Sequence, residues 1–143
     1  MLTTVEKVIF LQEIDIFEYT TTEDLAHIAA ITEELELKGD HVIFNEGDLP
    51  DGMYMVLDGT VRLTRSDQIV MDAKKKDVFG TWALFDDELR VVTAVTLEES
   101  RLLKIDKEDF VDLLADHVQI TQGILKTMAM RLRNLMAGVS RQA

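Results

Sequence analysis

Two residues in the middle of the chain have the type and spacing needed to hold an anion. Gly80 lies in the segment Asp77–Leu84, and Arg90 follows it by ten residues. A guanidinium donates two charge-assisted hydrogen bonds to one edge of a phosphate or carboxylate, and a glycine allows a close approach to the backbone. The pair therefore indicates an anion site. The simpler interpretation is that Arg90 begins a Val-Val strand and forms an ion pair with Asp87 or Glu88.

The other reactive side chains do not form a recognisable catalytic or metal-binding motif. The chain has no cysteine, which removes disulfides, thiolate metal ligands and cysteine nucleophiles. The three histidines, His27, His41 and His117, fall on three different predicted elements, and no two have the spacing of a metal-binding pair. No Ser/His/acid motif and no Walker-type phosphate loop occurs. We therefore expect neither a metal site nor enzymatic activity.

The charge of the chain argues against several kinds of partner. Its formal net charge is -12 at pH 7, and a surface of this sign repels nucleic acids and anionic lipids. After Asp116 the charged residues are all basic, so a basic helix follows an acidic body. The first residues do not resemble a signal peptide, and no apolar run approaches about 18 residues. We expect a cytoplasmic protein with no direct nucleic-acid binding and no membrane insertion.

The elements that position Gly80 and Arg90 fall into three stretches, which we predict to form a single domain over residues 1–143. Residues 1–33 show helical spacing of apolar residues and form a helical lead-in, whose second helix begins at the N-cap Thr21–Asp24. Residues 34–105 change to alternation and short apolar runs separated by Asp-Gly and Asn-containing turns. This middle stretch is typical of an antiparallel β-sandwich or barrel.

The third stretch, residues 106–143, returns to the helical period. Asp106 is expected to cap a first helix, and a longer helix follows around Gly123. An apolar stripe repeats at three- and four-residue steps along the longer helix and consists of Ile124, Met128, Leu132, Leu135 and Met136. An apolar stripe of this length is expected to be covered by another part of the chain or by a partner.

Two segments carry a resemblance to the cyclic nucleotide-binding domain family. Ile43–Asp48, leading into Gly52–Leu63, is similar to the first signature of that family, and its glycines stand where the family has them. Asp77–Leu84, followed by Arg90, is similar to the family's phosphate-binding cassette. Together with the helical lead-in and the C-terminal helices, the resemblance covers most of the chain. The family occurs in bacterial transcription factors resembling catabolite activator protein, in protein kinase regulatory subunits and in gated channels.

The resemblance implies a mainly β fold with flanking α-helices. This fold is an antiparallel β-roll or jelly roll, with N-terminal helices before it and a C-terminal helical hinge after it. The resemblance also implies a pocket for cyclic AMP or cyclic GMP, in which Gly80, Ala83, Leu84 and Arg90 face the cyclic phosphate. The expected ligand-binding residues are Leu63, Phe79, Gly80, Thr81, Trp82, Ala83, Leu84, Arg90, Val91 and Val92. We interpret Trp82 as a partly buried packing residue, the alternative being a ligand contact.

Thr81 departs from the family pattern. It stands where the family has a glutamate that accepts the ribose 2′-hydroxyl, so a charge-assisted hydrogen bond of about 1.5–3 kcal/mol is missing. Val91 adds bulk without a hydrogen-bond donor, and the acidic residues 86–88 are placed to pair with Arg90 themselves. Such pairing would neutralise the pocket.

Two functions follow from these observations. The first is a regulatory domain that binds a cyclic nucleotide and transmits binding through its C-terminal helices, with motion around Gly123, to an unknown effector protein or domain. The second is a degenerate roll that binds no nucleotide and serves as a dimerisation or protein-interaction scaffold. In the resembled family the last helix commonly pairs with its twin, so we expect a homodimer. The alternative is that the helix packs on its own body.

Overall fold

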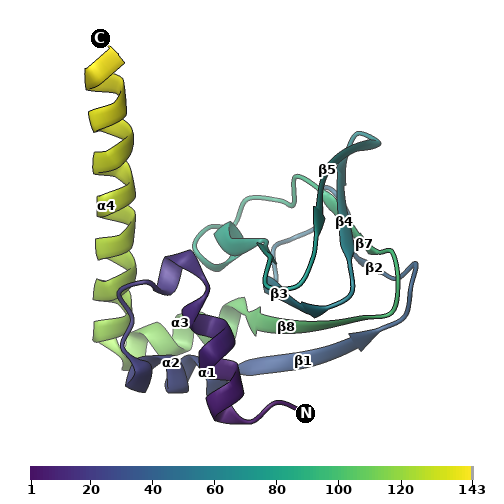
Figure 1. Ribbon diagram of the computed structural model, residues 1–143, viewed down its shortest axis with the longest axis horizontal. Helices are drawn as coiled ribbons and strands as arrows, with labels where there is room; N and C mark the ends of the chain where they lie inside the picture. The colour runs from purple at the N-terminus through teal and green to yellow at the C-terminus, as the bar shows by residue number, and fades with distance from the viewer. Residues whose placement is uncertain (143) are drawn as a thin grey trace. The chain divides into compact units, whose positions relative to one another are not determined.

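The computed structural model describes residues 1–142, which form a β-rich stretch with helices before and after it (Figure 1). The first half contains α1 (Thr4–Gln12), the 3-10 helix η1 (Asp15–Phe17), α2 (Thr22–Ala30), β1 (Thr32–Leu37), β2 (Val42–Phe44), β3 (Gly52–Asp58), β4 (Val61–Arg65) and β5 (Gln68–Ala73). The second half contains β6 (Val78–Phe79), the 3-10 helix η2 (Thr81–Leu84), β7 (Thr93–Thr96), β8 (Ser100–Asp106), α3 (Lys107–Asp116) and α4 (Val118–Gln142). This order confirms the predicted mainly β fold with flanking helices.

Two compact units can be distinguished, and the β-unit comprises residues 31–111. Its strands form two antiparallel four-stranded sheets, with strand orders β1-β8-β3-β6 and β2-β7-β4-β5. In Figure 1, β1, β8 and β3 lie side by side in the first sheet. Crossing of the chain between the two sheets closes them into the roll that the resemblance implied.

The core of the β-unit is filled by apolar side chains from both sheets. Its buried members are Phe44, Tyr54, Val56, Val61, Leu63, Ala73, Phe79, Ala94 and Leu102. Alternation along β4 places Val61 and Leu63 inward, as the sequence pattern predicted. Tyr54 stacks on Phe79 at a centroid distance of 5.3 Å, and Phe44 lies 6.1 Å from Phe79. Of these three rings, those of Phe44 and Phe79 line the pocket described below.

Gly52 is required at the start of β3 because two backbones approach closely there. A Cβ at this position would lie 2.4 Å from the carbonyl oxygen of Ile105 on β8. A side chain here would therefore push β3 away from β8. The next residues of β3 face defined partners, with Tyr54 opposite Lys104 on one side and Phe79 on the other. This register brings Tyr54 and Lys104 close to the loop that precedes Gly52.

The helical unit comprises residues 2–30 and the residues from 112 onward. Thr3 caps α1 through a reciprocal capping box with Glu6. The predicted cap of the second helix is present, because the Asp24 backbone N–H donates to Thr21 Oγ1 at 3.2 Å. None of the helices within residues 1–142 is long and apolar enough to cross a membrane.

The long helix α4 is continuous through Gly123, whereas the sequence suggested motion there. The break between helices falls at His117 instead, between α3 and α4. Gly123 has a packing role, since a Cβ at this position would lie 2.8 Å from the Tyr19 carbonyl oxygen. At the start of the apolar stripe Ile124 is buried, whereas Leu132, Leu135 and Met136 are exposed.

Candidate functional site

A pocket of ≈ 290 Å³ opens in the β-unit beside η2. Its residues come from β2, β4, β6, η2 and the loop before β7, together with Pro50. The lining residues are Phe44, Pro50, Leu63, Phe79, Gly80, Trp82, Ala83, Asp86, Glu88, Leu89, Arg90, Val91 and Val92. Most of this lining is apolar, and Arg90 is its one cationic member among the described residues.

Gly80 begins η2 in a conformation that only glycine adopts without strain. Its φ is 75° and its ψ is 20°, which is the left-handed region. A Cβ here would lie 2.7 Å from Arg90 Nη1 and 3.2 Å from the Gly52 carbonyl oxygen. Gly80 therefore makes room for the guanidinium, and it also turns the chain into a helical start whose first N–H groups have no partner within the turn.

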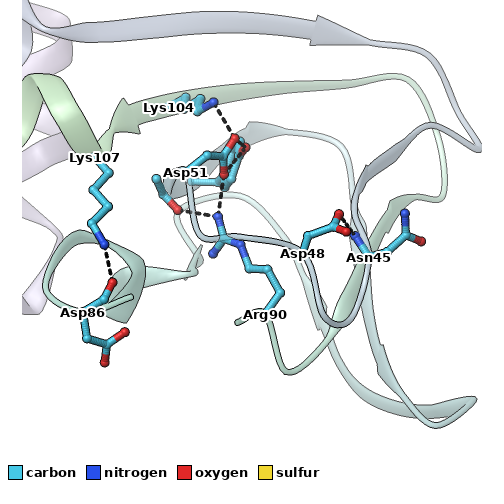
Figure 2. Close-up of polar contacts among 9 residues, drawn as sticks. Asn45, Asp48, Asp51, Asp86, Arg90, Lys104 and Lys107 are labelled. Carbon is cyan, nitrogen blue, oxygen red and sulfur yellow. Dashed lines mark hydrogen bonds and ion pairs between the residues drawn. The ribbon is translucent and has the colours of Figure 1, made fainter. Parts of the chain in front are cut away.

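Arg90 is the buried cation of the pocket, with a side chain that is only 5% exposed. Its Nη2 donates to Asp51 Oδ1 at 2.7 Å and to the Gly52 carbonyl oxygen at 2.8 Å (Figure 2). The guanidinium carbon lies 4.0 Å from the centroid of the Phe44 ring, a cation–π distance. Its Nε is buried and has no hydrogen-bond partner within residues 1–142.

Asp51 links Arg90 to a second cation. Its Oδ2 accepts a hydrogen bond from Lys104 Nζ at 2.9 Å, and the Tyr54 hydroxyl lies 3.3 Å from the same oxygen. Partial burial raises the pKa of Asp51, but the hydrogen bonds and charges of Lys104 and Arg90 outweigh it, so the net pKa is lowered. Burial and the Asp51 charge raise the pKa of Tyr54. One carboxylate therefore faces two cations, and the cluster of Asp51, Arg90 and Lys104 keeps a surplus positive charge.

The backbone on either side of Arg90 is also fixed. The Arg90 N–H donates to the Asp48 carbonyl oxygen at 2.8 Å, and the Arg90 carbonyl oxygen accepts from the Gly47 N–H at 2.8 Å. Because Arg90 is bonded to this turn and not to a neighbouring strand, β7 begins only at Thr93. The simpler alternative, in which Arg90 begins a Val-Val strand, is therefore wrong.

The alternative in which Asp87 or Glu88 pairs with Arg90 is also wrong. Asp87 forms an ion pair with Lys107 Nζ at 2.6 Å, and the Asp86 carbonyl oxygen accepts from the same ammonium group (Figure 2). Lys107 thus holds the loop after η2 away from the guanidinium. The partner of Arg90 is Asp51, which lies 39 residues away in sequence.

Eight of the ten residues expected to bind the ligand line this pocket. They are Leu63, Phe79, Gly80, Trp82, Ala83, Arg90, Val91 and Val92. Thr81 and Leu84 do not line it. Leu84 turns into the core, where it is 2% exposed, and Thr81 lies half-buried on η2. The packing interpretation of Trp82 was wrong, since its side chain is 63% exposed and lines the pocket.

Phe44 and Asp51 belong to the site although their sequence context does not indicate it. Phe44 stands in a short apolar run that predicts a strand, and Asp51 in an Asp-Gly pair that predicts a turn. No local spacing connects either residue to Arg90. The three histidines lie on different elements, as predicted, but the rings of His27 and His117 stack with centroids 4.1 Å apart in the helical unit, which no sequence spacing indicates.

Comparisons with known proteins agree with this architecture. The sequence profile of the family described as cyclic nucleotide-binding domain matches residues 34–117, which is more than half of the chain. The CRP-like cAMP-activated global transcriptional regulator of Mycobacterium tuberculosis is 29% identical over 114 residues, covering 74% of this chain and 51% of that protein. The Cyclic AMP receptor protein of Thermus thermophilus is 30% identical over 96 residues, covering 64% of this chain and 44% of that protein.

A solved structure extends the similarity to three dimensions. The N-terminal domain of a transcriptional regulator from Streptomyces coelicolor A3(2) superimposes with a TM-score of 0.82 at 27% identity, covering 88% of this chain and 94% of that one. The chain spans about half the length of the two curated regulators that it matches.

Proposed function

The chain belongs to the cyclic nucleotide-binding domain family, and from this membership we propose that it is a regulatory domain whose pocket takes up cyclic AMP or cyclic GMP. The cyclic phosphate is bound by Arg90 and the first backbone N–H groups of η2, starting at Gly80. Thr81 follows Gly80 directly and is the residue that we place nearest the ribose, although it does not line the pocket, and Leu63 belongs to the apolar wall against the base. Similarity to a regulator that is cAMP-activated by name favours cyclic AMP as the first ligand to test.

The observation that carries this proposal is the unpartnered Nε of Arg90. A buried polar N–H without a partner costs about 1–3 kcal/mol, and more when the group is charged. Nη2 is held by Asp51 and Gly52, so the side chain is already oriented before any ligand arrives. A phosphate oxygen accepting from Nε would remove the cost, and the surplus charge of the cluster would favour an anion.

The rest of the pocket supports a ligand with one charged end and one flat apolar end. Phe44, Phe79 and Leu63 provide a buried apolar wall, and the exposed Trp82 provides an aromatic face at the mouth. Such a combination of apolar lining and a few polar groups is usual for nucleotide-sized ligands. Glu88 also lines the pocket and supplies a carboxylate that a hydroxyl or amino group of the ligand can reach.

The test is a calorimetric titration of the purified protein with cyclic AMP and, separately, cyclic GMP. The Arg90→Ala variant removes the proposed phosphate ligand. The matched control is Arg62→Ala, because Arg62 forms a surface ion pair with Asp72 and does not line the pocket. The proposal predicts saturable binding in the wild type and in Arg62→Ala, and loss of binding in Arg90→Ala. Absence of heat at millimolar ligand in the wild type would overturn it.

We further propose that residues 1–143 act as one domain and that α4 pairs with its twin in a homodimer. The exposed apolar residues of α4 support this, since Leu132, Leu135 and Met136 belong to the apolar stripe and are exposed. Binding would be passed through these helices to an unknown effector protein or domain. We propose no catalytic role and no direct contact with nucleic acid.

The scaffold function remains the second candidate because Arg90 already has a carboxylate partner. Asp51 satisfies part of the guanidinium, and Thr81 supplies no carboxylate. If Asp51 is the only partner that Arg90 needs, the pocket binds no nucleotide and α4 alone carries the function. The titration above separates the two candidates.

A further inference from the structure

A second cluster of ligand-type side chains lies in the helical unit and belongs to no part of the proposed nucleotide site. It consists of Asp24 and His27 on α2 and His117 between α3 and α4. One ligand atom from each side chain lies within 4.8 Å of the others. None of the three side chains forms a hydrogen bond or ion pair with another residue in the described part of the chain, so their ligand atoms are not already engaged.

The backbone holds these side chains on two fixed elements. Asp24 and His27 are three residues apart on α2, so both lie on one face of that helix. His117 is fixed on both sides, because its N–H donates to the Leu113 carbonyl oxygen at 2.9 Å and its carbonyl oxygen accepts from the Ile120 N–H at 3.1 Å. The cluster is therefore set by secondary structure and does not depend on a long loop.

We propose that Asp24, His27 and His117 bind a divalent transition-metal ion of the zinc type. Two imidazoles and one carboxylate are ligands that zinc accepts, and three protein ligands leave a fourth position for water or another donor. The nitrogen ligands disfavour magnesium and calcium, which prefer sites built from oxygen. The ion would connect α2 to the residue directly before α4 and so fix the first turn of that helix.

Binding requires a small rearrangement of the side chains. A tetrahedral ion with bonds of 2.0–2.1 Å holds its ligand atoms about 3.3 Å apart. The two imidazole planes are inclined by 27°, and their stacking has to open before both rings can direct a nitrogen at one ion. The change that the proposal requires is a rotation of the His27 and His117 side chains.

The test uses the full chain without a histidine tag, because a tag would bind the same ions. Cobalt(II) replaces zinc as a visible probe, and its visible absorption reports tetrahedral coordination by protein ligands. The variants are His27→Gln and His117→Gln, which keep polar side chains of similar size. His41→Gln is the matched control, because His41 is the remaining histidine and lies in the β-unit.

The proposal predicts saturable cobalt absorption at one ion per chain in the wild type and in His41→Gln, with displacement by zinc. His27→Gln and His117→Gln should each weaken binding by at least about tenfold. A melting temperature measured with and without zinc guards against a folding defect, because zinc should raise it in the wild type and not in the two variants. Equal zinc stabilisation in all variants, or no cobalt absorption in the folded wild type, would overturn the proposal.

Discussion

Replacing Gly80 by alanine tests the structural centre of the site without assuming any ligand. The alanine has to adopt φ of 75°, which costs about 1–2 kcal/mol for a residue with a Cβ. The new Cβ also lies 2.7 Å from Arg90 Nη1 and 3.2 Å from the Gly52 carbonyl oxygen. Relieving this clash moves the guanidinium and breaks at least one charge-assisted hydrogen bond, worth about 1.5–3 kcal/mol. We therefore expect a loss of about 2.5–5 kcal/mol in the free energy of unfolding.

Two other glycines separate the backbone contribution from the steric contribution to this loss of stability. Gly47 has φ of 86° and no atom within 4 Å of an added Cβ, so Gly47→Ala should cost only the backbone contribution of about 1–2 kcal/mol. Gly138 lies in α4 with nothing near its Cβ position, so Gly138→Ala should stabilise the helix by about 0.5–1 kcal/mol. Urea unfolding of the three variants, followed by circular dichroism, gives the comparison. A loss in Gly80→Ala no larger than in Gly47→Ala would refute the steric role of Gly80.

Three further results are expected. Leu132→Glu should convert the proposed dimer to a monomer in sedimentation velocity, while Asn134→Glu on the opposite face of α4 should not; a monomeric wild type would contradict the pairing. Because the pKa of Asp51 is lowered on folding, its contribution to stability is present above the ordinary value of 3.8 and is lost as the pH falls through the lowered pKa. Urea titrations at several acid pH values should thus show that the free energy of unfolding falls less steeply with decreasing pH in Asp51→Asn than in the wild type. Equal pH dependence in the two proteins would contradict this expectation. Thr81→Glu should tighten cyclic AMP binding by about ten- to a hundredfold in calorimetry, the equivalent of one charge-assisted hydrogen bond, and unchanged affinity would place Thr81 away from the ribose.

Local patterns were sufficient to predict most of the fold. The alternation of Val61 and Leu63, the Asp58–Gly59 turn between β3 and β4 and the cap at Asp106 are short-range features, and each occurs where the sequence indicates. The turn predicted at Asp51–Gly52 is wrong, because Gly52 is already the first residue of β3. The end of the roll was harder to predict. Val91 and Val92 have the composition of a strand, yet hydrogen bonds from Arg90 to the turn at residues 47–48 delay β7 until Thr93.

The pocket could be predicted only in part, because its electrostatics depend on long-range pairing. Gly80 and Arg90 are recognisable by type and spacing. Asp51 is not, since its contact with Arg90 follows from the register of β3 against β8, which also delivers Lys104. Asp87 pairs with Lys107 and the Asp86 carbonyl oxygen accepts from the same ammonium group, so proximity in sequence to Arg90 does not decide the pairing. Contacts between His27 and His117 depend in the same way on how the helices pack.

The most direct test of the proposed phosphate site follows the Nε–H group of Arg90 by two-dimensional proton–nitrogen NMR during a titration with cyclic AMP. The Arg90→Lys variant assigns the resonance by its disappearance. Arg62 provides an internal control, because its Nε already donates to Asp72 Oδ1 at 2.8 Å. Our account predicts a saturable shift of the Arg90 Nε–H resonance while that of Arg62 stays in place. An Arg90 resonance that remains unmoved at millimolar cyclic AMP and cyclic GMP would contradict it.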